Sequence, residues 1–125
     1  MRSSGRGSRT DRGAATMYAA ALATVLVTAA TIAVLVVTAV LASHRARAAA
    51  DLSALAGATA QADGLDACRT AGVVAQANGA SLTTCQVAGS PLSFVVSITV
   101  AVGTGLRAPL PVAVHADAKA GSVPG

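Results

Sequence analysis

Two cysteines are the residues whose type and number most directly suggest chemistry in this 125-residue chain. Cys68 and Cys85 are its only cysteines, and no cluster of His or carboxylate residues accompanies them. Two thiols supply only half of the four ligands that a structural zinc ion requires. Outside a cell membrane, such a pair forms a disulfide more often than a metal site. We therefore predict a disulfide between Cys68 and Cys85 and no metal site.

The remaining ionisable residues do not form the pattern of an active site. His44 and His115 have no nucleophile that would complete a triad, and the sequence contains neither a paired-carboxylate site nor a glycine-rich phosphate loop. We predict no catalytic residue, no cofactor and no small-molecule substrate.

One strongly apolar stretch near the N-terminus, residues 13–44, contains no Lys, Arg, Asp or Glu. An apolar run of about 18 residues or more can cross a bilayer as a helix, because the helix satisfies its own backbone hydrogen bonds. The remaining residues are too few to bury a helix that is apolar on all sides. We predict a transmembrane helix over residues 13–43, with residues 19–41 in the hydrocarbon.

The charges beside this span predict its orientation. Four arginines and one aspartate precede it within residues 1–12, whereas Arg45 and Arg47 follow it and are soon offset by Asp51. The positive-inside rule then places the N-terminus in the cytoplasm and the C-terminal part outside. A basic arm beside a span suits anionic lipid headgroups, and with one Tyr and one Phe the chain lacks the aromatic residues typical of nucleic-acid binding. We therefore predict a membrane partner and no nucleic acid.

Residues 1–12 are rich in Gly, Ser and Arg, which predicts a disordered cytoplasmic arm.

The apolar run could be either a cleaved signal peptide or an uncleaved membrane anchor. Val40, Leu41 and Ala42, directly before Ser43, resemble a signal-peptide cleavage site, but the apolar run is about twice as long as a signal-peptide core of ~7 to 15 residues. We favour an uncleaved anchor.

The helical pattern continues beyond the span. Residues 44–62 favour helix, with Leu52, Leu55, Ala56, Thr59 and Ala62 on one side, so we predict one long helix that is half in the membrane and half outside. Asp63 and Gly64 should end it. A second helix is predicted over residues 65–77, with Asp66 in its first turn, Cys68 on its packing face and Asn78–Gly79 at its end.

The period changes from 3.6 to 2 at Ser81, which predicts strands. In the first strand, one face is expected to carry Thr83, Cys85 and Val87. Residues 88–91 should form the turn. The second strand is the clearest, with one wholly apolar face made by Leu92, Phe94, Val96, Ile98, Val100 and Val102. A third strand over residues 110–117 is predicted to be an edge strand because it contains Pro111.

Together these elements predict an α+β fold: a long N-terminal transmembrane helix that continues outside, a short second helix and a three-stranded antiparallel sheet. The expected domain organisation is an arm at 1–12, the span at 13–43, an extracytoplasmic domain at 44–118 and a flexible tail at 119–125.

Two segments carry a resemblance to a known family. RARAAADLSALAGA, residues 45–58, resembles the "RxRAAADLAALA" stretch of the TadE/TadG-like proteins of actinobacteria, and ANGASLTTCQV, residues 77–87, is similar to the "ANGA..L..C.V" segment of the helicase/secretion-neighbourhood TadE-like group. The layout of helix, sheet and cysteine pair is similar to that of type IV pilins and pseudopilins.

This resemblance implies a non-enzymatic, pilin-like component of tight-adherence pilus assembly or a related secretion apparatus. Its partners would be other TadE or pilin-like subunits and inner-membrane assembly proteins. Better-known relatives are cleaved after a Gly, with a Glu five residues beyond the cut. Here the cut would fall between Gly13 and Ala14, Tyr18 stands at the Glu position, and the chain has no Glu. Cleavage after Gly13 and a Gly that simply starts the helix both remain open. The alternative function is a membrane-anchored, monomeric extracytoplasmic binding module.

Threonines mark one side of the predicted span. Thr24, Thr28, Thr31 and Thr38 follow one another at intervals of four, three and seven residues. Small and hydroxylated residues allow close helix approach and cross-helix hydrogen bonds in lipid, so this side could contact a partner helix. Alternatively, each hydroxyl bonds its own helix four residues back.

Overall fold

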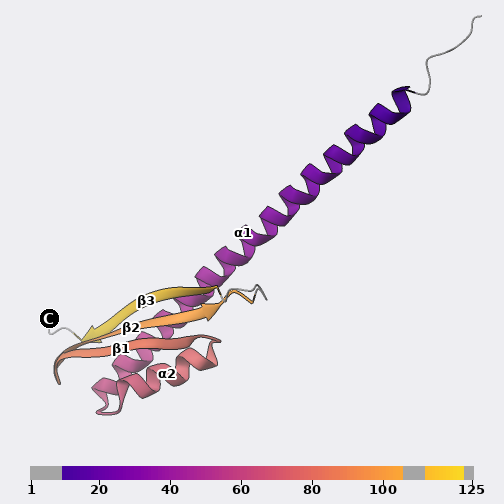
Figure 1. Ribbon diagram of the computed structural model, residues 1–125. Coiled ribbons are helices and arrows are strands. Elements are labelled where there is room, and N and C mark those ends of the chain that lie inside the picture. Colours follow the sequence, from indigo (N-terminus) through magenta and orange to yellow (C-terminus); the bar gives the residue numbers. More distant parts are fainter. Residues whose placement is uncertain (1–9, 106–111, 123–125) are drawn as a thin grey trace, which may run out of the picture. The chain divides into compact units, whose positions relative to one another are not determined.

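The computed structural model describes residues 10–105 and 112–122. In chain order the elements are α1 (Thr10–Ala62), α2 (Ala67–Ala77), β1 (Ser81–Ser90), β2 (Ser93–Gly103) and β3 (Ala113–Ser122) (Figure 1). A long apolar helix, a short second helix and an antiparallel three-stranded sheet confirm the expected α+β class. The chain divides into two units, Met1–Val37 and Thr38–Gly125.

The first unit is the N-terminal part of α1. From Gly13 to Val37 the side chains are exposed on every side, including the large apolar ones such as Leu26 and Ile32. Within the described ranges, α1 is the one helix long and apolar enough to cross a membrane. Exposure of apolar side chains around the whole circumference is what a helix in lipid requires, because lipid takes the place of a protein core.

The C-terminal part of α1 belongs to the second unit and ends where the sequence predicts. Gly64 has φ +73, a conformation that favours glycine, and its N–H donates to the carbonyl of Gln61 at 3.1 Å. The N–H of Leu65 donates to the carbonyl of Ala60 at 2.8 Å. These bonds satisfy carbonyls that the end of a helix would otherwise leave unpaired. The predicted break at Asp63 and Gly64 is therefore confirmed.

The second helix is capped at both ends. Asp66 is the N-cap of α2, and its side chain accepts a hydrogen bond from the backbone N–H of Arg69 at 2.9 Å. At the other end, Asn78 is the C-cap and Gly79 follows with φ +72. The predicted start at Leu65 was two residues early, because Asp66 caps the helix from outside its first turn.

The sheet has the order β1-β2-β3, so β2 is central and β3 is an edge strand. In Figure 1 the strands lie over the C-terminal part of α1, and α2 lies beside β1. The inner face of β2 is the predicted apolar face. Its buried residues are Phe94, Val96, Ile98, Val100 and Val102.

Small residues of the two helices cover this apolar face. On α1 the core residues recur at intervals of three, one and four, as one side of a helix does. They are Ala46, Ala49, Ala50, Ala54 and Ala58, and α2 adds Ala67, Ala71 and Ala75. Ser53 and Gly57 are buried on the same side of α1. Large side chains thus come from the sheet and small ones from the helices, so the backbones approach closely.

The hairpin between β1 and β2 differs from its prediction. Ser90 pairs with Ser93, so Pro91 and Leu92 form the turn, whereas residues 88–91 were expected there. Proline suits the first central position because its φ is fixed near −65°. Gly89 remains in the strand, where a Cβ would collide with the backbone of Ser93. Leu92 is 85% exposed rather than part of the core face.

A bulge in β1 also changes the predicted face of that strand. Leu82 pairs with Val100 and Thr84 pairs with Thr99, which leaves Thr83 as the extra residue. The Thr83 hydroxyl instead donates to the carbonyl of Thr99 at 3.0 Å. Leu82 and Cys85 therefore both pack against the core, and the expectation that Thr83 shares the face of Cys85 was wrong.

The third strand is displaced toward the C-terminus. It begins at Ala113 and continues to Ser122, where it pairs with Phe94. The prediction of a flexible tail over residues 119–125 was therefore wrong for residues 119–122, because backbone pairing with β2 continues through them. Of the predicted third strand, residues 110 and 111 lie outside the described part, as do 123–125 of the predicted tail. Of the predicted disordered arm, residues 10–12 belong to α1, and residues 1–9 are not described.

Candidate functional site

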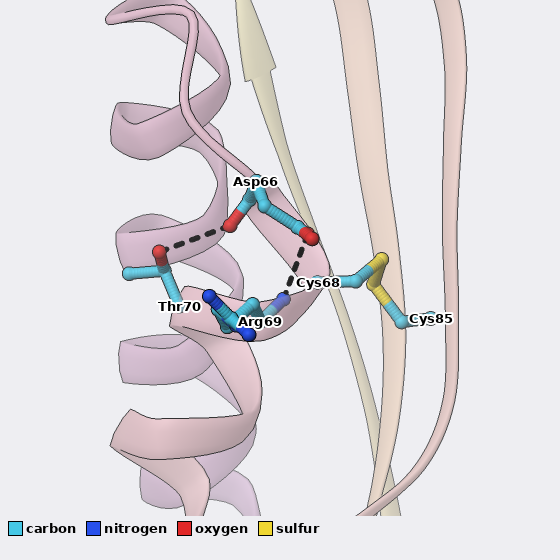
Figure 2. The surroundings of a disulfide bond; sticks show 5 residues. All are labelled: Asp66, Cys68, Arg69, Thr70 and Cys85. Carbon is cyan, nitrogen blue, oxygen red and sulfur yellow. Dashed lines mark hydrogen bonds between the residues drawn. A yellow bond between two sulfur atoms is a disulfide. The ribbon is translucent and has the colours of Figure 1, made fainter.

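The cysteine pair joins α2 to β1 (Figure 2). Cys68 and Cys85 form a disulfide across 17 residues of sequence, with their Cα atoms 5.8 Å apart. Cys68 stands in the first turn of α2, two residues after the Asp66 cap. There the carbonyl of Asp66 also accepts the hydroxyl of Thr70 at 3.0 Å. The predicted disulfide is present, and it ties a capped helix end to an edge strand as a structural crosslink.

The described ionisable residues are exposed, and four of them line one cavity: Arg47 and Asp51 of α1 with His115 and Asp117 of β3. His44 and His115 are both exposed, on α1 and on the outer face of β3 respectively. Asp117, also on β3, accepts the hydroxyl of Thr99 at 2.6 Å. Across residues 10–105 and 112–122, no group of three or more His, Cys, Asp or Glu residues could hold a metal ion.

Three of the threonines that could contact a partner helix donate their hydroxyls to backbone carbonyls of α1 itself. Thr24 donates to the carbonyl of Ala20 at 2.9 Å, Thr28 to that of Thr24 at 2.8 Å, and Thr31 to that of Val27 at 2.8 Å. This is the bonding that the alternative interpretation predicts for these three residues. The hydroxyls remain on the exposed helix surface, so a role in close helix contact stays a prediction. Thr38 is half-buried and belongs to the second unit.

The proposed processing position lies inside the helix. Gly13 and Ala14 are exposed residues of α1, and the carbonyl of Gly13 accepts the hydroxyl of Thr16 at 2.9 Å. Because α1 begins at Thr10, Gly13 does not start the helix, and that interpretation of its role was wrong. Cleavage between Gly13 and Ala14 remains a prediction.

An apolar groove lies between α1 and α2 on the side away from the sheet. Its volume is ≈650 Å³, and Leu52 and Leu55 of α1, with Leu65 and Val74 near and on α2, line much of it. Leu55 is 61% exposed and Leu65 is 63% exposed. The predicted helix side with Leu52 and Leu55 is thus the exposed one. Its leucine spacing was visible in the sequence, but the contribution of α2 was not.

The outer face of the sheet is polar by contrast. It carries a hollow of ≈350 Å³ whose polar lining residues come from all three strands: Thr84, Gln86, Ser97, Thr99, Asp117 and Lys119. Hydroxyl, amide and charged groups therefore gather on one face, and no aromatic side chain lines the hollow.

Comparisons with known proteins do not assign a family. No family model matches the chain, and neither the curated proteins nor the solved structures include a match to it. The described surfaces include the apolar exterior of α1, the groove between the helices and the polar outer face of the sheet.

Proposed function

We propose that this chain is a single-pass membrane protein and a non-enzymatic, TadE-like, pilin-like component of tight-adherence pilus assembly or a related secretion apparatus. Its N-terminus would lie in the cytoplasm and its domain outside the cell membrane. The observation that carries the proposal is the division of α1 into two parts. The helix is exposed and apolar on all sides up to Val37, and beyond Ala42 it carries a stripe of small residues covered by a sheet.

The segments that resemble the TadE-like group support the proposal through their positions. Residues 45–58 contain most of the α1 stripe, including Ala46, Ala50 and Ala54. Residues 77–87 contain the end of α2 and β1 as far as Val87, including the bonded Cys85. The resembling residues therefore build the fold of the domain, and the proposed role depends on that fold being shared.

Exposed apolar surface outside the span also favours association. Leu52, Leu55 and Leu65 leave about half or more of their surface uncovered beside one another. Contiguous apolar patches are rare on monomeric soluble surfaces and commonly mark protein interaction sites. A subunit that packs against neighbouring subunits would remove this groove from water.

Crosslinking in cells tests the assembly role. We expect short crosslinkers to give oligomers through α1, and the tagged full-length protein to co-purify with a secretion ATPase or an inner-membrane platform protein. A protein that stays monomeric and brings down neither of these would contradict the assembly role and leave the membrane anchor unaffected.

Labelling of Ser122→Cys tests the orientation. Ser122 is exposed at the end of β3, and both native cysteines are held in the disulfide. The introduced cysteine therefore carries the thiol that a maleimide can label. A membrane-impermeant maleimide should label it in intact cells. Ser4→Cys, before the span, is the matched control and should react only after lysis. The reverse pattern would refute the proposed orientation.

The second candidate function is a membrane-anchored, monomeric binding module. The polar hollow on the outer face of the sheet, with Thr99 bonded to Asp117, favours this alternative. Replacing Thr84 and Gln86 by Ala would then abolish partner capture by a protein that is monomeric before and after the change. The assembly role predicts that the same variant still assembles.

A further inference from the structure

One end of the sheet lies against the turn of α1 that follows the first unit. Thr38, Leu41, Ala42 and Arg45 of α1 line a cavity of ≈100 Å³ together with Val102–Thr104 at the end of β2. The sequence alone places Thr38 and Leu41 in the hydrocarbon, within residues 19–41. The structure instead brings polar backbone and the Thr104 side chain next to them.

The closing bonds at this end hold β2 and β3 together. The backbone N–H and the hydroxyl of Thr104 both donate to the carbonyl of Val112, at 3.2 and 3.0 Å. Val112 is 52% exposed and is therefore fixed as an outward apolar residue beside Thr104. Gly103 and Gly105 flank Thr104, and both are exposed.

The Thr104 N–H is bonded to Val112, but the sheet is open and its edge strands β1 and β3 cannot lie in hydrocarbon. Irregular chain at membrane depth is tolerated only where protein or water satisfies its polar groups, since each unsatisfied group costs several kcal/mol in lipid. The hydrocarbon must therefore end before the turn of α1 that contacts Gly103 and Thr104, which places its outer boundary at about Val37. A span of ~20 residues counted back from Val37 begins at Tyr18.

The residues at both proposed boundaries suit this placement. Tyr18, the single tyrosine of the chain, would stand at the inner boundary, where tyrosine is enriched in membrane proteins. At the outer boundary, Arg45 and Arg47 are exposed; Arg47 shares a cavity with Asp51 and Asp117, whereas no acidic residue lines the cavity at Arg45. Val40 and Leu41 are each 49% exposed and precede these arginines on α1 by one to two turns. Apolar side chains mixed with basic ones are typical of a surface that contacts anionic headgroups.

We propose that the end of the sheet formed by Val102–Thr104 and Val112 rests in the headgroup layer of an anionic phospholipid bilayer, together with residues 38–47 of α1. The hydrocarbon then covers residues 18–37 only. This inference rests on α1 being a membrane span, and it is independent of any role in pilus assembly.

Depth measurements on the full-length protein test this contact. Single cysteines are introduced with the native disulfide intact, spin-labelled, and reconstituted into nanodiscs of phosphatidylcholine with phosphatidylglycerol. Collision with oxygen, which partitions into lipid, is compared with collision with an aqueous nickel chelate. The label positions are Leu26→Cys within the span, Val40→Cys and Val112→Cys at the proposed boundary, and Leu92→Cys in the β1–β2 turn.

We expect the Leu26 label to report hydrocarbon and the Leu92 label to report water, because the 11 residues of β2 extend roughly 35 Å. The Val40 and Val112 labels should share an intermediate, headgroup depth. A Val112 label as accessible to nickel as the Leu92 label would overturn the contact while the Leu26 label still reports a span. A Val40 label as deep as the Leu26 label would also overturn it. A Leu26 label in water would refute the span itself.

Lipid composition separates headgroup binding from simple proximity. In nanodiscs of phosphatidylcholine alone, the Val112 label should become severalfold more accessible to nickel, because Arg45 and Arg47 lose their anionic partners. In an Arg45→Ala, Arg47→Ala background, accessibility should no longer differ between the two lipids. A difference that persists in this background would overturn the assignment of headgroup binding to these arginines.

Discussion

Val96 of the central strand lies directly against Gly57 of α1: a Cβ built on Gly57 would come within 3.3 Å of Cγ1 of Val96 and 3.1 Å of the carbonyl oxygen of Ala67. Gly57 is thus the point where α1, α2 and the sheet meet. The closeness of these three elements depends on the missing side chain.

Enlarging Gly57 should therefore destabilise the domain. Gly57→Val forces backbone or core residues to move, and we expect a loss of about 1 to 3 kcal/mol, as for other overpacked cores. Pulse proteolysis in increasing urea measures this, because it reports unfolding of the domain while detergent holds the rest of α1. Gly72→Ala in α2 is the matched control. Its Cβ would meet only Leu82 at 3.6 Å, so it should gain up to about 1 kcal/mol from helix propensity. Equal stabilities for the two variants would contradict the close packing at Gly57.

Removal of the only buried hydroxyl in the α1 stripe should stabilise the protein. Ser53 is fully buried, and its Oγ has no hydrogen-bond partner among the described residues. An unsatisfied buried polar group costs about 1 to 3 kcal/mol, so Ser53→Ala should raise the free energy of unfolding by roughly 1 kcal/mol. Ser43→Ala, at a half-buried position of the same helix, should change it by less than about 0.5 kcal/mol. A destabilised Ser53→Ala variant would mean that the hydroxyl is bonded in solution.

Loss of the disulfide should weaken the attachment of α2 to β1. The closed loop spans 17 residues, and crosslinks of that size contribute about 3 kcal/mol. We expect the Cys68→Ser, Cys85→Ser variant to unfold at lower urea by a comparable free energy, with β1 and α2 becoming protease-sensitive first. Non-reducing mass spectrometry of protein from its native envelope provides the independent check, since two free thiols there would rule out the crosslink in the cell.

The threonine side of the span gives the prediction that concerns partners most directly. Because three hydroxyls are bonded within the helix, their contribution to a partner contact would come from small size rather than from new hydrogen bonds. Thr24→Leu with Thr28→Leu should leave insertion and the folded domain intact but reduce oligomers and co-purified assembly proteins. Ala29→Leu with Ala33→Leu enlarges two small residues on another side of α1, and we expect it to behave as wild type. Equal yields from both double variants would show that the threonine side is ordinary lipid-facing surface and would favour the binding module.

The sequence by itself determined which elements form and where the helices end. The charge-free run, the glycines at 64 and 79 and the alternation from Phe94 to Val102 are local signals, and each acts through backbone conformation or a single periodic face. The cysteine pair was also predictable, because two thiols outside a membrane have few other uses. Local reasoning failed at Ser90–Ser93 and at Thr83, where pairing with β2, a neighbour distant in sequence, fixed the turn and the bulge.

Only the tertiary structure decided which side of α1 is buried. Residues 44–62 offer a leucine side and an alanine side, and hydrophobicity alone would favour burial of the leucines. The sheet supplies valine, isoleucine and phenylalanine, so the facing helix must supply small side chains for the layers to fit. That choice leaves Leu52 and Leu55 exposed as a groove. It also brings Thr104 beside Thr38, which the sequence alone had placed in the membrane.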